Sequence, residues 1–294
     1  MKCAYKGLYE LYVNTHERTI GFGKCCVIND CLDFGKISFE DFYSLADPWE
    51  FIKFKYSILP NGHCTTPPNH TFCKDCSKCD WRDIPLDAIR VNINSCNLNC
   101  IMCNNDHSYD RESMEMYWHL LNMCKNRGLK QIIPTTGGEP FLQKNKMVDY
   151  ICSLTKADCE KINIISNATL LDADSIARMA DAAKNNGIEL KIQVSIDSCD
   201  PETYMKIRGA TSEQYNKVMA NIMELKTHGI LSGVNIVMMP ENKDTVLKDI
   251  EYWKENDIWV HVLPIRYDNG VGADQIKELI TEVKEKYPQY YGDA

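Results

Sequence analysis

The chain has 294 residues, enough to bury a large core in one or two domains. Its 44% hydrophobic and 25% charged residues are ordinary for a globular protein, and no stretch approaches the roughly 18 apolar residues of a transmembrane helix. A net charge of −8 argues against a nucleic-acid groove as the main binding surface.

The 15 cysteines are an odd and high number. The N-terminus lacks the apolar segment of a signal peptide, so we expect a cytoplasmic protein in a reducing environment. Clustered cysteines in that environment bind metals or iron–sulfur clusters more often than they form disulfides. We therefore expect metal centres rather than a disulfide framework.

Residues 1–83 are the first predicted unit and hold eight of the cysteines. Alternating residues over 8–13 and 19–26, separated by a polar turn, predict a β-hairpin. A helical segment is expected within 38–56, with Ser38 as its N-cap. Cysteines then recur at three-residue spacing, at Cys73, Cys76 and Cys79, which indicates a metal site and leaves zinc and an iron–sulfur cluster both open.

From residue 88 onward, predicted strands alternate with helices, which favours parallel βα units. The strands are expected over 88–94, 130–134, 161–165, 189–196, 233–238 and 258–263. The helices are expected over 108–126, 143–156, 172–186, 212–228, 243–255 and 273–286. Six repeats predict an α/β fold with a partial, TIM-like (βα)6 barrel over 84–294, preceded by a small cysteine-rich β-hairpin/α domain over 1–83.

Cys96, Cys100 and Cys103 follow the first strand of this barrel. Active sites of parallel α/β barrels are built on loops at this end of the strands. A closed structural zinc site needs four ligands, whereas three thiolates on a [4Fe–4S] cube leave one iron open. The alternative is a zinc site that staples a non-catalytic binding protein.

The Cys-x3-Cys-x2-Cys spacing after the first strand resembles that of the radical S-adenosylmethionine (SAM) enzymes. The sequence Gly137-Gly138-Glu139-Pro140 looks like the SAM-amino motif of that superfamily. Two further stretches, Ser195-Ile196-Asp197-Ser198 and Tyr204-Met205-Lys206-Ile207-Arg208-Gly209, are similar to the SAM-contacting segment of the SPASM/twitch subgroup. The resemblance extends from residue 85 to about 265.

The N-terminal third resembles a SPASM or twitch module, which carries auxiliary [4Fe–4S] clusters. In that subgroup the module usually follows the barrel, whereas here it precedes the barrel. The resemblance implies an auxiliary cluster whose ligands are a subset of six cysteines, namely Cys3, Cys25, Cys26, Cys73, Cys76 and Cys79.

The resemblance also implies the chemistry. Cys96, Cys100 and Cys103 would hold three irons, SAM would chelate the fourth, and one electron would cleave SAM to a 5′-deoxyadenosyl radical that removes a hydrogen atom from the substrate. The SAM-binding residues it implies are Gly137, Gly138 and Glu139 for the ammonium group, Arg208 for the carboxylate, Ser166, Asn167 and Ser195 for the ribose or carboxylate, and Met102 for the adenine.

Cys199 follows the fourth barrel strand and is a candidate hydrogen-atom donor, with an inert loop thiol as the simpler interpretation. The function expected from the resemblance is oxidation, crosslinking or epimerisation of a peptide or small molecule, with electrons from a flavodoxin- or ferredoxin-type donor. No membrane partner is expected. A radical SAM enzyme that acts on nucleic acid is the other alternative, which the acidic charge disfavours.

Overall fold

The computed structural model describes residues 8–24, 35–57, 86–103, 107, 109–135, 137–265 and 273–292. Within these residues the strands form one nine-stranded sheet in the order β3-β2-β1-β4-β5-β6-β7-β8-β9. The strands are β1 Leu8–Asn14, β2 Thr19–Lys24, β3 Lys36–Ser38, β4 Ala88–Ile93, β5 Leu129–Pro134, β6 Cys159–Ser166, β7 Glu189–Ser195, β8 Leu231–Met238 and β9 Val260–Pro264.

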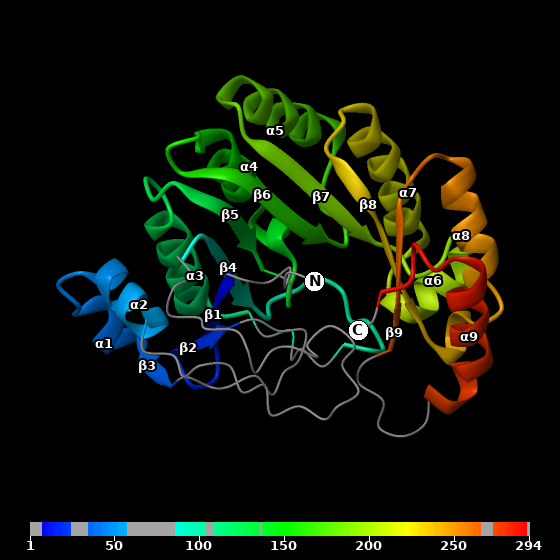
Figure 1. Ribbon diagram of the computed structural model, residues 1–294, viewed down its shortest axis with the longest axis horizontal. Helices are drawn as coiled ribbons and strands as arrows, with labels where there is room; N and C mark the ends of the chain where they lie inside the picture. The colour runs from blue at the N-terminus through cyan, green and yellow to red at the C-terminus, as the bar shows by residue number, and fades with distance from the viewer. Residues whose placement is uncertain are drawn as a thin grey trace.

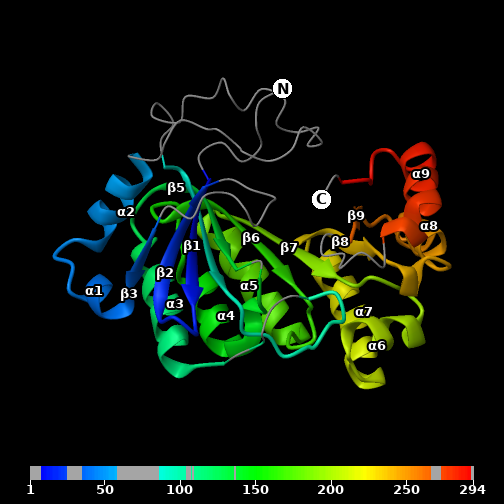
Figure 2. The same cartoon turned by 90° about the horizontal axis from the view of Figure 1, so that it is seen from below.

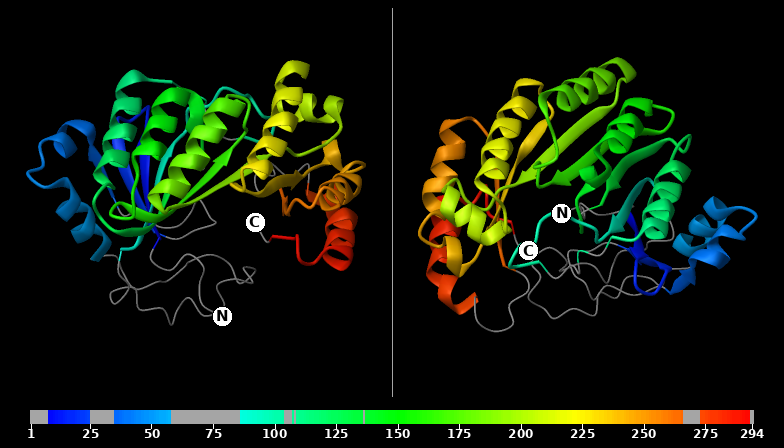
Figure 3. Two further views of the ribbon diagram at one scale, coloured as in Figure 1. Left: turned by 90° about the horizontal axis from the view of Figure 1, so that it is seen from above. Right: turned by 180° about the vertical axis from the view of Figure 1, so that it is seen from behind.

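Helices connect the parallel strands and cover the outer side of the sheet. The described α-helices are α1 Phe39–Tyr43, α2 Pro48–Ser57, α3 Arg111–Met123, α4 Lys144–Ser153, α5 Ala173–Asn186, α6 Pro201–Arg208, α7 Ser212–Thr227, α8 Val246–Glu255 and α9 Lys277–Lys286. Figure 1 shows the sheet as an arch with α3, α4, α5 and α7 along its outside, and Figure 3 shows the same layer from two other sides. The predicted α/β fold with a partial barrel is confirmed.

The N-terminal hairpin belongs to the same sheet as the barrel. Strand β1 pairs in parallel with β4, with Leu11 opposite Val91, and antiparallel with β2. Figure 2 shows β1 and β2 beside the barrel strands. The described parts of residues 8–57 share one hydrophobic core with the barrel. The predicted domain boundary at 83/84 lies outside the described residues.

The two faces of the barrel strands differ in chemistry. In β7, Leu190, Ile192 and Val194 are buried in the core, where α5 packs against the strand. The alternating side chains of Lys191 and Gln193 are half-buried on the opposite, inner face. Because successive side chains of a strand point to opposite faces, the inner surface of the arch is polar at β7.

Two local differences from the sequence prediction have clear causes. The expected helix within 38–56 is two helices, because Asp47 accepts a hydrogen bond from the Glu50 N–H at 3.0 Å and Pro48 opens a new first turn. Helix α6 was not expected. It begins after Asp200, whose side chain accepts from the Thr203 N–H, and it ends at Gly209 in the left-handed conformation.

The helix ends that the sequence did predict are present. Ser38 caps α1 by accepting a hydrogen bond from the Asp41 N–H at 3.0 Å. Gly187 ends α5 with φ at 68°, which a residue with a side chain adopts only at a cost. In the described part of the chain, none of the helices combines the length and apolar character needed to cross a membrane.

Candidate functional site

The three cysteines lie on the loop that leaves β4. Each has a free, half-buried thiol, and the Cys103 N–H donates to the Cys100 carbonyl oxygen at 3.0 Å, which closes a tight turn. The described residues contain no group of three or more His, Cys, Asp or Glu side chains placed to hold a single metal ion. In a [4Fe–4S] cube each thiolate binds a different iron, so the sulfurs need not converge on one point.

A turn after β5 packs directly on this loop. A Cβ added to Gly138 would lie 2.5 Å from the Ile93 carbonyl oxygen and closer still to that of Ser95. The Glu139 N–H donates to the same Ser95 oxygen at 2.9 Å. Glycine is therefore required at 138 because the turn touches the main chain of the cysteine loop.

The N–H groups of this turn are directed into the protein. Those of Gly137 and Gly138 donate to the Thr135 hydroxyl oxygen at 3.2 and 3.3 Å, and Thr135 itself has a positive φ of 47°. Among the described residues, no N–H or side chain donates to the carbonyl oxygens of Gly137 or Gly138. These oxygens are acceptors suited to a ligand's ammonium group.

Glu139 is buried and holds the end of β6. Its carboxylate accepts from the Ser166 hydroxyl and the Asn167 N–H, both at 2.8 Å, and from the Phe141 N–H at 3.0 Å. Burial raises the pKa of Glu139 to about 7, against these hydrogen bonds. Both carboxylate oxygens thus already accept hydrogen bonds from the chain.

Asn167 connects this network to the cysteine loop. Its amide nitrogen donates to the Asn97 side-chain oxygen at 3.0 Å and lies 3.8 Å from Cys96 Sγ. Asn97 in turn donates to the Thr169 hydroxyl at 2.8 Å. The loops after β4, β5 and β6 are therefore one hydrogen-bonded unit, as their common position at the carboxyl ends of parallel strands predicts.

Arg208, at the end of α6, contacts the same loop. Its side chain is 8% exposed, its Nη1 lies 3.7 Å from Cys100 Sγ, and its Nη2 lies 2.6 Å from Asp197 Oδ2. Asp197 is fully buried and follows β7 with a positive φ of 60°. The sequence singled out Arg208 and gave no role to Asp197, although aspartate after a buried strand tolerates this conformation and is one signal for such a site.

The family model for the radical SAM superfamily matches residues 93–252, which is more than half of the chain. The chain belongs to the radical SAM superfamily. That membership makes it an enzyme and implies a [4Fe–4S] cluster, SAM and a source of reducing electrons. The superfamily prediction is confirmed, whereas the SPASM/twitch subgroup stays a prediction.

Two curated relatives show how far the similarity extends. A "Probable GTP 3',8-cyclase" of Methanococcus aeolicus is 24% identical over 191 residues, covering 63% of this chain and 61% of the relative. A "GTP 3',8-cyclase" of Alkaliphilus oremlandii is 26% identical over 221 residues, covering 69% and 65%. The chain thus spans about three fifths of the length of such relatives.

A solved structure described as "Native anSMEcpe with bound AdoMet" matches with a TM-score of 0.53 and 15% identity, covering 69% of this chain and 61% of that one. At this identity the similarity concerns the fold. It agrees with the partial barrel described above.

The residues at the site of this radical SAM enzyme fit the implied groups. Burial raises the pKa of Cys96 to about 11 and also raises that of Cys100, where the Arg208 cation opposes the effect. Thiols bind iron as thiolates, so cluster binding would release protons from these side chains. The carbonyl oxygens at 137 and 138, to which none of the described residues donates, suit the SAM ammonium group.

The remaining predicted residues have varied positions. Ser195 ends β7 on the polar inner face, beside Asn235 of β8, and Met102 is half-buried in the cysteine loop. Ser166 and Asn167 hold Glu139, as described above. Six predicted auxiliary ligands lie outside the described residues, namely Cys3, Cys25, Cys26, Cys73, Cys76 and Cys79.

Cys199 lies on the loop between β7 and α6 and contacts residues of α7 and α8. Its N–H donates to Asp249 Oδ1 at 2.9 Å, and its carbonyl oxygen accepts from the Tyr215 hydroxyl at 2.5 Å. Burial, and next the Asp249 carboxylate, raise the pKa of its thiol. Its proposed role as a hydrogen-atom donor stays a prediction.

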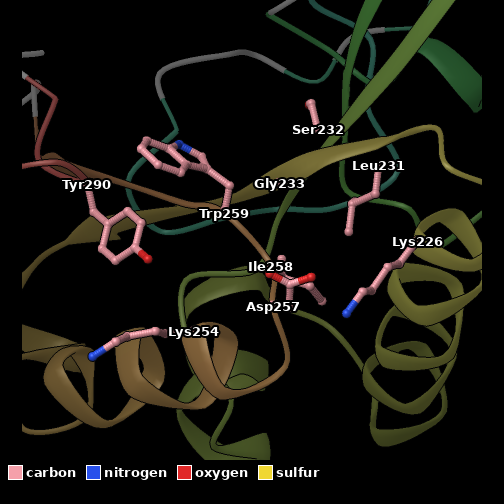
Figure 4. A pocket seen from close by; sticks show the side chains of 9 residues that line it. All are labelled: Lys226, Leu231, Ser232, Gly233, Lys254, Asp257, Ile258, Trp259 and Tyr290. Atoms are coloured by element: carbon pink, nitrogen blue, oxygen red, sulfur yellow. The ribbon is translucent and has the colours of Figure 1, made fainter.

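A cavity of about 440 Å³ lies at the other end of the barrel. Figure 4 shows Gly233, Trp259 and Tyr290 around it, with Lys226 and Lys254 approaching from α7 and α8. Gly233 and Trp259 lie at the amino ends of β8 and β9, whereas the cysteine loop lies at the carboxyl end of β4. This cavity is therefore separate from the candidate active site.

Proposed function

We propose that the enzyme cleaves SAM reductively and removes a hydrogen atom from a small polar molecule or a peptide bound on the inner face of the arch. The observation that carries this proposal is the packing of the Cys96, Cys100 and Cys103 loop on the Gly137–Glu139 turn. When bound and reduced, the cluster would supply the electron for SAM cleavage, and the 5′-deoxyadenosyl radical so formed would take the hydrogen atom and become 5′-deoxyadenosine.

In this proposal the chain's own residues bind and orient. The three thiols hold the cluster, and the carbonyl oxygens of Gly137 and Gly138 receive the SAM ammonium group. Glu139 holds Ser166 and Asn167 at the end of β6, and Asn167 contacts the cysteine loop. Ser195, on the open inner face, is placed to contact SAM or substrate.

The test is anaerobic reconstitution with iron and sulfide, followed by dithionite and SAM. The wild-type protein is expected to form 5′-deoxyadenosine, and the triple variant Cys96→Ala/Cys100→Ala/Cys103→Ala is expected to form none. A matched control is Cys124→Ala/Cys159→Ala, which removes two buried thiols outside the loop. Continued 5′-deoxyadenosine formation by the triple variant would refute the assignment.

The N-terminal cysteines add a second part to the proposal, a SPASM- or twitch-like auxiliary cluster. It rests on the cysteine spacing alone. Wild-type protein should then bind about eight irons, and the triple variant above about four. About four irons in the wild type and none in the triple variant would exclude the auxiliary cluster.

A purine nucleotide is the second candidate substrate, because the relatives carry the name GTP 3',8-cyclase. If GTP is the substrate, adding it to the reconstituted enzyme should increase 5′-deoxyadenosine formation and consume GTP. Equal formation with and without GTP would exclude it.

A further inference from the structure

The end of helix α6 lies against the cysteine loop, and the two segments run in opposite directions. The Ile101 N–H donates to the Ile207 carbonyl oxygen at 2.9 Å, and a Cβ on Gly209 would lie 2.9 Å from the Asn99 carbonyl oxygen. Between them, Arg208 Nη1 lies 3.7 Å from Cys100 Sγ. Three consecutive residues of one segment thus contact three consecutive residues of the other.

The guanidinium group of Arg208 is fixed from its other side as well. Asp197 Oδ2 lies 2.6 Å from Arg208 Nη2, and Asp197 Oδ1 accepts from the Val237 N–H at 2.8 Å. The Asn242 side chain donates to the Asp197 carbonyl oxygen at 2.8 Å. Strand β8 therefore holds the Asp197 carboxylate, and the segment after β8 holds the Asp197 main chain.

Both charges of this pair are out of water, with Arg208 8% exposed and Asp197 fully buried. Salt screens buried charges much less than exposed ones, so both charges act more strongly on nearby groups than exposed charges would. The cation lies between the carboxylate and the sulfur. The Cys100 sulfur therefore experiences mainly the positive member of the pair.

We infer that Arg208 is a positioning residue that sets the reduction potential of the cluster held by Cys100, and that Asp197 is its opposing charge. The inference rests on the proposed function. Reduction adds one electron, and hence one negative charge, to the cluster. A fixed cation that donates a hydrogen bond to a ligand sulfur stabilises that charge and raises the potential, and a fixed anion lowers it.

The experiment is an anaerobic redox titration of reconstituted protein without SAM, followed by electron paramagnetic resonance of the reduced cluster. Arg208→Gln is expected to shift the potential to a more negative value, and Asp197→Asn to a less negative one. Arg208→Lys keeps the charge and should lie closer to the wild type than Arg208→Gln. Iron content and circular dichroism are measured for every variant.

Arg178 and Asp149 provide matched controls, because they form an exposed ion pair at 3.1 Å between α5 and α4. Arg178→Gln and Asp149→Asn should leave the potential unchanged. The inference is overturned if Arg208→Gln and Asp197→Asn have the wild-type reduction potential while Arg208→Gln binds SAM more weakly. Arg208 would then be a SAM ligand.

Two further results remain decisive. If Asp197→Asn or Arg208→Gln loses its iron, the comparison uses Arg208→Lys instead. The reduction potentials of Arg208→Lys and the wild type are measured before and after SAM is added. A difference between these potentials that appears only with SAM overturns the inference. A wild-type protein that binds no iron would refute the proposed function, and this inference with it. Wild-type iron with unshifted variants refutes the inference alone.

Discussion

Two loops at the same end of the barrel carry cysteines, and their surroundings differ. The loop after β4 presents three half-buried thiols, with the Arg208 guanidinium 3.7 Å from Cys100 Sγ. The loop after β7 presents Cys199, whose N–H donates to the buried carboxylate of Asp249. A cation adjoins the first sulfur and an anion adjoins the second.

The difference shows that a position at a strand end does not decide what a cysteine does. The nearby cation favours the thiolate, the form that binds iron, whereas the nearby carboxylate favours the neutral thiol. A neutral S–H group is what hydrogen-atom donation would need, and a thiolate is what a cluster needs. Each of the following predictions perturbs one of the two loops and leaves the other intact.

The largest effect is expected for Gly138→Ala, which pushes the turn after β5 away from the cysteine loop. The new methyl group would overlap the carbonyl oxygens of Ser95 and Ile93, which are main-chain atoms. We expect a loss of about 3 kcal/mol in the free energy of unfolding, measured by urea titration, together with a reduced iron content.

Gly21→Ala is the control for that substitution, since its Cβ would meet Tyr12 at an ordinary 3.7 Å. It should change the free energy of unfolding by less than about 1 kcal/mol. Wild-type stability and iron content in Gly138→Ala would mean that the turn and the loop are not packed as described.

An effect of at most similar size is expected for Glu139→Gln, and it depends on pH. The folded protein holds the Glu139 pKa at about 7, above the ordinary value of 4.5, because the carboxyl group is buried. A raised carboxyl pKa means that the folded state binds more protons than the unfolded state between pH 4.5 and 7. Stability from this group is therefore present below pH 4.5 and is lost as pH rises to 7.

The measurement compares urea unfolding of Glu139→Gln and the wild type across that range. Over that range the wild type should lose about 3 kcal/mol of unfolding free energy that the variant does not lose, so the stability of the wild type falls relative to that of the variant as pH rises. Glu115→Gln, at an exposed position of α3, should follow the wild-type curve. Parallel curves for Glu139→Gln and the wild type would contradict a raised pKa.

The sequence predicted the elements well, because apolar alternation follows directly from which face of a strand is buried. Leu190, Ile192 and Val194 carry that signal for β7, and Gly187 marks the end of the preceding helix. The order of the strands after residue 88 follows from the regular alternation of strands with helices along the chain. The parallel pairing of β1 with β4 did not follow, since a hairpin gives no local sign of its third neighbour.

At the site, the sequence predicted which residues lie on the loops at the strand ends, but it did not predict which other residues contact those loops. Cys96, Cys100 and Cys103 and the glycine turn were identified from spacing. The contacts of Ile207, Arg208 and Gly209 with the cysteine loop depend on where α6 docks, and Asp197 pairs with Arg208 across eleven residues of chain. A local sequence pattern does not determine tertiary contacts of this kind.

The smallest effect is expected for Asp249→Asn, which removes the anion beside Cys199 while keeping an oxygen that can accept its N–H. Because that carboxylate raises the Cys199 pKa, its removal should lower the pKa and increase the thiolate fraction at a given pH. We expect alkylation of Cys199 by iodoacetamide at pH 9 to become about two- to tenfold faster, measured by mass spectrometry of the Cys199 peptide.

The exposed Asp244→Asn, five residues earlier, is the matched control and should leave the alkylation rate of Cys199 unchanged. Since Asp249→Asn does not touch the loop after β4, the alkylation of Cys100 in the same metal-free sample should also be unchanged. An equal increase at both cysteines would mean that the variant loosens the whole barrel end, and the contrast between the two loops would then not be electrostatic.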